Sequence, residues 1–264
     1  MIEKVVIIGA GNLGTQLALA LVEKGICIQQ IYSRTMEQAK QLADKVSAGF
    51  TNDLSRLTPD ADLYIIAVKD SAILKVLENL ELNETSLIVH TAGSVTMNIL
   101  EGFSLNYGVF YPIQTFSKFR KVDFSNIPIC IEANHPSTLI KLQELAEKLS
   151  ASVNQINSDD RKTLHLAAIF VNNFVNHFYA IGADILQDKK LDFDLLRPLI
   201  FETAEKIKNT HPIVSQTGPA KRNDQPIIDT HLKMLQDQPA LQKIYSFVTE
   251  SIFQYQQKQE NDLL

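Results

Sequence analysis

Three glycines near the N-terminus have the spacing of a phosphate-binding turn. They lie in the run Gly9-Ala10-Gly11-Asn12-Leu13-Gly14, which follows a short apolar run typical of a buried strand and precedes a helical pattern. In that setting the first glycine permits a tight turn, the second lets a pyrophosphate approach the backbone, and the third lets the helix pack against the strand. The phosphates would meet free N–H groups and the positive end of the helix dipole. We therefore predict dinucleotide binding by Gly9, Gly11, Asn12, Leu13 and Gly14. Under the alternative, these glycines serve packing alone.

The residues after the second predicted strand indicate which dinucleotide binds. An NAD site ordinarily has a carboxylate there, which accepts hydrogen bonds from the ribose hydroxyls. This chain instead has Ser33, Arg34 and Thr35, and no acid. A guanidinium can pair with a 2′-phosphate through two hydrogen bonds, and the two hydroxyls can add more. We therefore predict that NADP binds rather than NAD. Under the alternative, Arg34 is solvated and Thr35 only caps the next helix.

Three further segments follow predicted strands, and ligands of parallel sheets bind beyond the carboxyl ends of the strands. These segments are residues 67–70, 90–94 and 111–116. The small side chains in 90–94 permit close approach of a nicotinamide ring. The predicted cofactor contacts in the first two segments are Ala67, Val68, Thr91, Ala92 and Gly93. The predicted substrate contacts are Ser94, Tyr111, Gln114 and Thr115. Two alternatives stay open: Asp70 or Ser71 caps the following helix, and the segment 111–116 is an ordinary corner between sheet and loop.

A row of polar side chains is predicted on one long helix over residues 159–187. At about 100° per residue, His165, Asn172 and Asn176 fall within roughly 20° of one line, whereas Asn173 and His177 are displaced to one side. The apolar residues around them predict that most of the helix is buried, so the row needs partners. An imidazole beside carboxamides suits proton transfer and substrate orientation. The predicted catalytic residues are His165, Lys162, Asn172 and Asn176. Under the alternative, the row bonds to other helices and fixes their register.

A second polar cluster over residues 217–224 interrupts the helical pattern at Gly218 and Pro219. We predict that Arg222 and Asp224 contact the substrate, because loops often carry the polar groups of a site. The alternative is a solvated connector between two helices.

Alternating strand and helix patterns position these residues. Strands are predicted at 4–9, 26–32, 48–51, 62–68, 86–90, 107–111, 127–132 and 151–156, with helices at 12–24, 35–46, from Ser71, and at 136–149. Strand patterns stop near residue 157, and helices are predicted at 159–187, 192–208, 225–237 and 239–257. This order predicts an α/β fold, a doubly wound and mostly parallel Rossmann sheet followed by an all-α C-terminal domain. The predicted domains are 1–156 and 157–264.

Composition narrows the class of protein. Of the 264 residues, 45% are hydrophobic and 21% are charged, as in ordinary globular proteins. A net charge of −5 argues against nucleic-acid binding, and no apolar run predicts a membrane span. Cys27 and Cys130 lie far apart in apolar segments, which predicts two buried, reduced thiols in the cytoplasm. No pattern predicts a metal site. The apolar faces of 161–187 and 239–254 predict a homodimer.

Taken in order, these motifs resemble those of a bacterial family that joins a Rossmann-like domain to a C-terminal domain of unknown function. They are GAGNLG, SR, AVKD, HTAGS, YPIQTF, HLAAIFVNNFVNH and TGPAKRND. More distantly, the chain is similar to pyrroline-5-carboxylate reductase, prephenate dehydrogenase, ketopantoate reductase and 6-phosphogluconate dehydrogenase. That resemblance implies reduction of C=O or C=N bonds, or the reverse oxidation, with NAD(P)H in the crevice. Several of these enzymes carry a catalytic lysine with an asparagine four residues later. Here Leu166 stands four residues after Lys162.

The motifs and the resemblance together predict an NADP-dependent reductase of a small carbonyl or imine compound, with a ketopantoate-like keto acid as the first candidate substrate. His165, or alternatively Lys162, would protonate the developing oxyanion or amine. Asn172 and Asn176 would orient the substrate, and Arg222 would hold a carboxylate. Two other hypotheses remain: an NADP-binding sensor or scaffold without catalysis, and a reductase that takes its hydride from a deazaflavin.

Overall fold

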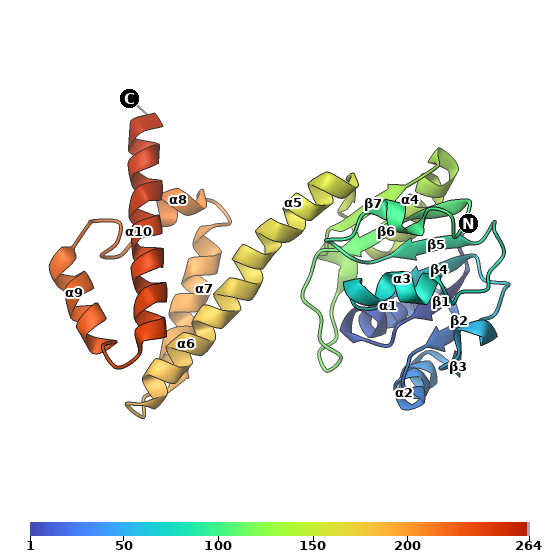
Figure 1. Cartoon of the computed structure of the whole chain (residues 1–264), viewed down its shortest axis with the longest axis horizontal. Helices are drawn as coiled ribbons and strands as arrows, with labels where there is room; N and C mark the ends of the chain where they lie inside the picture. Colours follow the sequence, from blue (N-terminus) through green and yellow to red (C-terminus); the bar gives the residue numbers. More distant parts are fainter. Residues whose placement is uncertain (263–264) are drawn as a thin grey trace. The chain divides into compact units, whose positions relative to one another are not determined.

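The computed structural model describes residues 1–262, and the first half of the chain alternates strands with helices (Figure 1). The eight strands are β1 (Lys4–Ile8), β2 (Cys27–Tyr32), β3 (Gly49–Thr51), β4 (Leu63–Ile66), β5 (Leu87–His90), β6 (Asn106–Pro112), β7 (Ile129–Ala133) and β8 (Val153–Gln155). They form one sheet in the order β3-β2-β1-β4-β5-β6-β7-β8. Every neighbouring pair is parallel except β6 and β7. The predicted doubly wound, mostly parallel sheet is confirmed.

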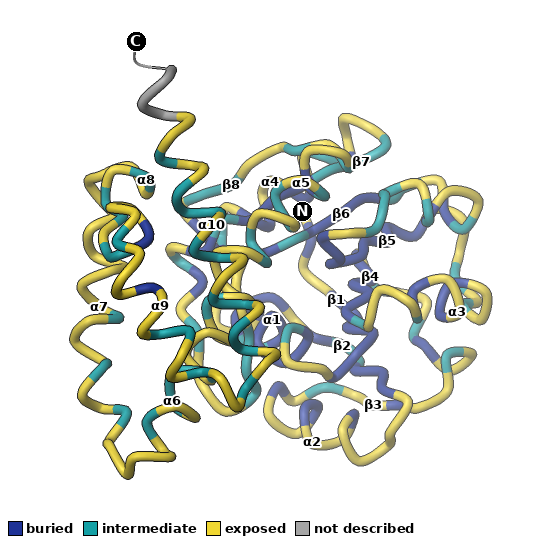
Figure 2. The backbone as a smooth tube through the Cα atoms, turned by 60° about the vertical axis from the view of Figure 1, so that its left-hand side comes forward, coloured by how far each residue is buried: buried dark blue, intermediate teal, exposed yellow. Residues whose placement is uncertain are grey.

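Helices cover both faces of this sheet because consecutive strand residues point to opposite sides. Val5 and Ile7 face α1 (Asn12–Glu23), α2 (Met36–Val46) and α4 (Pro136–Leu149). Val6 and Ile8 face the other layer, which contains α3 (Ile73–Leu77) and the short helices η1 (Leu54–Arg56) and η3 (Met97–Leu100). The central strands are therefore buried on both sides, as the dark segments of Figure 2 show. Two further short helices are η2 (Asp70–Ala72) and η4 (Phe124–Asn126).

The rest of the described chain is helical, as predicted. Its elements are α5 (Ser158–Ala168), η5 (Ile169–Phe174), α6 (Val175–Gln187), η6 (Phe193–Leu196), α7 (Arg197–Lys206), α8 (Pro212–Ser215), α9 (Gln225–Met234) and α10 (Pro239–Asp262). The single helix predicted over 159–187 is continuous, but η5 in its middle is a π-helix. None of the helices in residues 1–262 is both long and apolar enough to cross a membrane.

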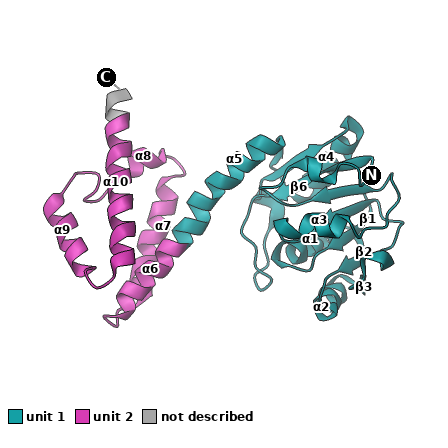
Figure 3. Ribbon diagram, viewed as in Figure 1, with its two compact units in different colours: residues 1–176 teal, residues 177–264 magenta. Residues whose placement is uncertain are grey.

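The chain divides into two compact units, residues 1–176 and 177–264 (Figure 3). The last strand ends at Gln155 and α5 begins at Ser158, so the structural class changes where the sequence predicts it. The first compact unit nevertheless extends past the predicted domain boundary at residue 156. The reason is that Ser158, Arg161 and His165 of α5 contact residues of the Rossmann sheet and its loops.

Two burial predictions are wrong. The helix over 159–187 is not buried on most of its circumference, because Leu166, Phe170 and Val171 are exposed. Apolar periodicity shows that a face needs cover but does not show whether the same chain supplies it. Cys27 is also exposed, since it is the first residue of β2, whereas Cys130 is buried in β7 as predicted.

Candidate active site

The carboxyl ends of the central strands bring the predicted cofactor residues to one edge of the sheet. Ile8 at the end of β1 is in register with Tyr32 of β2 and with Ile66 of β4. The N–H of Gly9 donates to the carbonyl of Tyr32 at 2.8 Å, which ties the glycine turn to the end of β2. The turn, residues 33–35 and residues 67–68 therefore meet where the strand order reverses, the position at which such sheets bind nucleotides.

The three glycines of the turn have different surroundings. Gly9 has a φ of 124°, and a Cβ there would overlap the carbonyl of Ala67. A Cβ on Gly14 would overlap the carbonyl of Gly9. A Cβ on Gly11, in contrast, would meet only the carbonyl oxygen of Ala67, at 4.0 Å, and no side-chain hydrogen bond caps α1. Packing thus explains Gly9 and Gly14 but not Gly11. The open space beside Gly11 and the uncapped N–H groups fit a pyrophosphate.

Residues 33–35 fit a 2′-phosphate. Ser33 is buried, and its N–H donates to the carbonyl of Thr51 at 3.2 Å. Arg34 is exposed, and no carboxylate of the described residues forms an ion pair with it. Thr35 is the N-cap residue of α2, but its side chain makes no capping bond. The guanidinium and the Thr35 hydroxyl are therefore available to an anionic ligand.

A buried histidine holds the loop after β5 in shape. His90 ends the strand, and its Nδ1 accepts a hydrogen bond from the N–H of Ala92 at 3.1 Å. Its Nε2 lies 3.3 Å from the carbonyl of Thr96, so the proton belongs on Nε2. Burial, and secondarily the positive charge of Arg161, lower the pKa of His90 from 6.5 to about 4. The neutral ring therefore braces residues 91–96 at neutral pH. We did not predict this role, although a histidine at the end of an otherwise apolar strand is its signal.

The structure brings together three residues with different predicted roles. They are Gly93, a predicted cofactor contact, Tyr111, a predicted substrate contact, and His165, a predicted catalytic residue. The Tyr111 hydroxyl lies 3.0 Å from Nδ1 of His165, and the two rings meet edge to face with centroids 6.1 Å apart. A Cβ on Gly93 would lie 2.6 Å from Nδ1 of His165 and 2.9 Å from Cζ of Tyr111. Burial raises the pKa of Tyr111, so its hydroxyl keeps its proton at neutral pH. A phenol and an imidazole in contact can hold and pass a proton at this edge of the sheet.

Ser94 and Asp70 form a second polar pair at the same rim. The Ser94 hydroxyl donates to the Asp70 carboxylate. Asp70 begins η2 without capping it, because the N-cap position is Lys69 and no side-chain bond is made there. The capping role considered for Asp70 is therefore not what the structure shows. Gln114 and Thr115 are exposed after β6, where the Gln114 side chain accepts from the Thr115 N–H at 2.8 Å.

Comparison with known proteins establishes the family. Residues 4–93 match the family model described as NADP oxidoreductase coenzyme F420-dependent, and residues 127–252 match a domain of unknown function, DUF2520. A solved structure from Bacteroides fragilis, provisionally described as an NADP oxidoreductase, is 48% identical over 96% of this chain and 98% of its own, with a TM-score of 0.90. The chain belongs to this family of NADP oxidoreductases. The protein is thus an NAD(P)-dependent oxidoreductase, and its cofactor is NADP.

More distant structures share the fold of this NADP oxidoreductase. A pyrroline-5-carboxylate reductase from Coxiella burnetii is 18% identical over 98% of both chains, with a TM-score of 0.60. An imine reductase from Myxococcus stipitatus, solved with NADP⁺, is 13% identical over 98% of this chain and 94% of its own, with a TM-score of 0.64. No curated protein sequence matches the chain.

The prediction of a straight polar row on the long helix of the oxidoreductase is wrong. The row assumed about 100° per residue, but the π-helical turn η5 lies between His165 and Asn176 and includes Asn172. A π-helical turn accommodates about one extra residue, so it rotates everything after it by roughly 100° relative to His165. Asn172, Asn173 and Asn176 are all exposed. Their roles in substrate orientation stay predictions.

Two other groups of predicted residues lie apart from the contact between His165 and Tyr111. Lys162 is half-buried and pairs with Asp159 at 3.3 Å, one turn earlier on α5. Arg222 is exposed in the second compact unit, and Asp224 is the N-cap residue of α9. The N–H of Asp224 donates to the carbonyl of Pro219 at 3.0 Å, which closes the predicted loop. Substrate contacts by Arg222 and Asp224 stay predictions.

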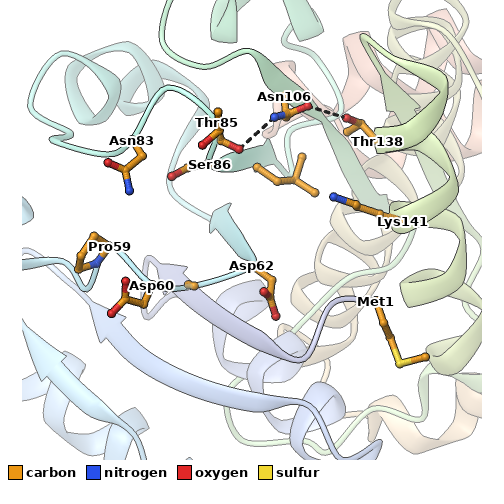
Figure 4. Close-up of a pocket in the computed structure, with 12 residues that line it drawn as sticks. Met1, Pro59, Asp60, Asp62, Asn83, Thr85, Ser86, Asn106, Thr138 and Lys141 are labelled. Carbon is orange, nitrogen blue, oxygen red and sulfur yellow. Dashed lines mark hydrogen bonds between the residues drawn. The ribbon is translucent and has the colours of Figure 1, made fainter.

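A cavity of about 350 Å³ opens at the opposite edge of the sheet (Figure 4). It is lined by Asp62, Leu87 and Asn106, which lie at the amino ends of β4, β5 and β6, and by Lys141 from α4. Asp62 is already engaged, because its carboxylate accepts the N–H groups of Glu3 and Lys4, both at 2.9 Å. Dinucleotides bind at the carboxyl ends of such strands, so this cavity is separate from the cofactor site.

Proposed function

We propose that the protein reduces a small carbonyl or imine compound with NADPH, and that a ketopantoate-like keto acid is the first substrate to test. The observation that carries the proposal is the contact of His165 and Tyr111 with Gly93, in the loop that follows β5 at the cofactor edge. NADPH supplies a hydride when it is bound. The residues around it must then hold the dinucleotide in place and deliver one proton to the reduced group.

The glycine turn and residues 33–35 would hold the dinucleotide. The N–H groups at the start of α1 would donate to the pyrophosphate, and the open space beside Gly11 would admit it. Arg34 would pair with the 2′-phosphate, while Ser33 and Thr35 would add hydroxyl donors. Ala67, Val68 and residues 91–93 would border the nicotinamide ring, because they follow β4 and β5 at the same edge.

His165 would deliver the proton, with Tyr111 as its partner. The Tyr111 hydroxyl orients the imidazole through Nδ1, which leaves Nε2 to face a substrate. Ser94 would hydrogen-bond the substrate while Asp70 fixes the orientation of its hydroxyl. Lys162 is the weaker candidate for proton donor, because Asp159 already pairs with it. Asn172 and Asn176 would orient the substrate, and Arg222 and Asp224 would bind its polar groups.

A titration followed by a substrate screen tests this function. We expect NADPH to enhance its fluorescence on binding at lower concentration than NADH does, and one of a panel of keto acids and cyclic imines to be turned over. His165→Gln should then lower kcat by about 100-fold or more without weakening NADPH binding, as expected for loss of a general acid. His135→Gln is the matched control, since His135 is exposed and makes no capping bond to α4. Full turnover by His165→Gln would contradict the proposed role of His165 as proton donor.

We also propose that the protein is a homodimer. The second compact unit exposes large apolar side chains that water should disfavour, among them Leu199 (62% exposed), Phe201 (66%) and Phe247 (74%). Leu166, Phe170 and Val171 of the first unit are exposed in the same way. A second copy of the chain would bury such faces, and obligate dimers bury more than about 2,000 Å² of this kind of surface. Light scattering at micromolar concentration should give twice the mass of one chain, and a monomeric mass would contradict the proposal.

A further inference from the structure

Arg161 is the largest fully buried side chain among the described residues, and no part of the proposed chemistry uses it. Its relative exposure is 0%, and its Nη1 forms an ion pair with Glu132 of β7. Its Nη2 donates to the carbonyl of Val95 at 2.5 Å and to the hydroxyl of Ser158 at 3.2 Å. One guanidinium therefore links α5 to β7 and to the loop that follows β5.

Ser158 completes the same set of contacts. Its N–H donates to Glu132 Oε1 at 3.0 Å, and its hydroxyl donates to Glu132 Oε2 at 2.8 Å. That hydroxyl also accepts the N–H of Met97 at 2.9 Å. The first turn of α5 is thus bonded on one side to β7 and on the other to residues 95–97. We call Glu132, Ser158 and Arg161, with the backbone of Val95 and Met97, the α5 clamp.

Stability alone does not explain the α5 clamp. Removing two charges from water costs several kcal/mol, and apolar residues of similar volume are often as stable or more so. The guanidinium is also incompletely satisfied, because no group within residues 1–262 accepts a hydrogen bond from the buried Nε of Arg161. What an ion pair provides and an apolar contact does not is directional bonding to several fixed groups at once.

The α5 clamp holds two parts of the proposed active site: the start of α5, which carries His165, and the loop after β5. His165 stands one helical turn after Arg161 on α5, so the two side chains share a face of the helix. Gly93 and Ser94 directly precede Val95, whose carbonyl accepts from Arg161. We propose that Arg161 is a positioning residue: by bonding Glu132, Ser158 and Val95 together, it holds the His165 ring against Gly93 and in hydrogen-bond contact with Tyr111. This inference rests on the proposed function of His165.

Arg161→Lys tests the proposal most directly. A lysine can keep the charge beside Glu132, but its single nitrogen cannot bond Glu132 and Val95 in the geometry of the planar guanidinium. We expect a folded protein in which the ring signals of His165, followed by NMR on histidine-labelled protein, move toward their position in Tyr111→Phe. NADPH should bind within about twofold of wild type. With a keto acid or imine that is turned over, kcat should fall about 10- to 100-fold while the KM for NADPH holds, because a misplacement of about 1 Å costs on that order.

Ser158→Ala and Lys121→Met complete the experiment. Ser158→Ala removes the bonds of the hydroxyl to Glu132, Arg161 and Met97 but leaves the ion pair between Arg161 and Glu132. It should therefore shift the His165 signals in the same direction by a smaller amount, even where Arg161→Lys does not fold. Lys121→Met removes an ion pair with Glu23 that is exposed, and it should leave the His165 signals unchanged. Unshifted His165 signals in folded Arg161→Lys or Ser158→Ala would overturn the positioning role. Failure of the wild-type protein to bind NADPH would instead overturn the proposed function, and the His165 signals would still decide the role of the clamp.

Discussion

Replacing Gly93 with alanine should separate the placement of His165 from the binding of NADPH. The new Cβ would lie 2.6 Å from Nδ1 and 2.7 Å from Cγ of His165, and 2.9 Å from Cζ of Tyr111. Ordinary van der Waals contact begins at 3.4 Å, so the imidazole must retreat by about 0.8 Å. Gly93 is not in a left-handed conformation, and the substitution therefore acts through this clash rather than through backbone strain.

The size of the effect follows from these distances. Overpacking of a tight contact costs about 1–3 kcal/mol, and loss of the hydrogen bond between Tyr111 and His165 costs about 1 kcal/mol. We therefore expect the free energy of unfolding to fall by about 2–4 kcal/mol. Turnover should fall further, since displacement of a reacting group by about 1 Å costs on the order of 100-fold.

Three measurements on Gly93→Ala check this reasoning. Chemical unfolding gives the loss of stability, NADPH fluorescence gives the affinity for cofactor, and steady-state kinetics gives kcat. We expect a moderately destabilised protein that binds NADPH within about tenfold of wild type and has lost most of its turnover. Turnover at the wild-type rate, or wild-type signals for the His165 ring, would refute the placement of His165 against this glycine.

The remaining predictions concern the cofactor turn and the buried histidine. Gly11→Ala should change the free energy of unfolding by no more than about 0.5 kcal/mol, because the new Cβ meets only one atom, at 4.0 Å. The same Cβ should fill the space for the phosphate and lower the affinity for NADPH about tenfold or more. Unchanged affinity in a fluorescence titration would contradict this prediction. Arg34→Gln should weaken NADPH binding about 10- to 100-fold and leave NADH binding unchanged, which parallel titrations measure. Because the pKa of His90 is about 4 in the folded protein and near 6.5 when unfolded, the unfolded chain binds the proton first. Stability is then complete above pH 6.5 and falls by up to about 3 kcal/mol as the pH drops to 4. Urea unfolding of His90→Asn should lack this fall, whereas His135→Gln should keep it.

Local signals in the sequence were sufficient for the sheet and the glycine turn. A turn of this kind depends on residues that are neighbours in the chain, so the spacing of Gly9, Gly11 and Gly14 already contains its geometry. The structure adds a distinction that spacing cannot give. Gly9 faces the carbonyl of Ala67, which follows β4, and Gly14 faces the carbonyl of Gly9, whereas Gly11 faces open space.

The α5 clamp and the π-helical turn could not be predicted in the same way. Glu132 and Arg161 lie on separate elements, and nothing in either local sequence indicates that the two charges pair in the interior. The turn η5 contains no glycine or proline to interrupt the helical pattern, so the sequence predicts the ordinary period of 3.6 residues across it. His165 lies before η5, so its position does not depend on that period, whereas the predicted alignment of Asn172 and Asn176 with it does.

The position of the compact-unit boundary has a consequence for the chemistry. The domain boundary expected at residue 156 would assign the cofactor and the proton donor to different domains, and their approach would depend on how those domains meet. In the structure the α5 clamp attaches the start of α5 to β7 and to the loop after β5, so residues 1–176 form one compact unit. That unit contains the glycine turn, Gly93, Tyr111 and His165 together. The distance between the carboxyl edge of the sheet and the proposed proton donor is therefore set by packing within one compact unit.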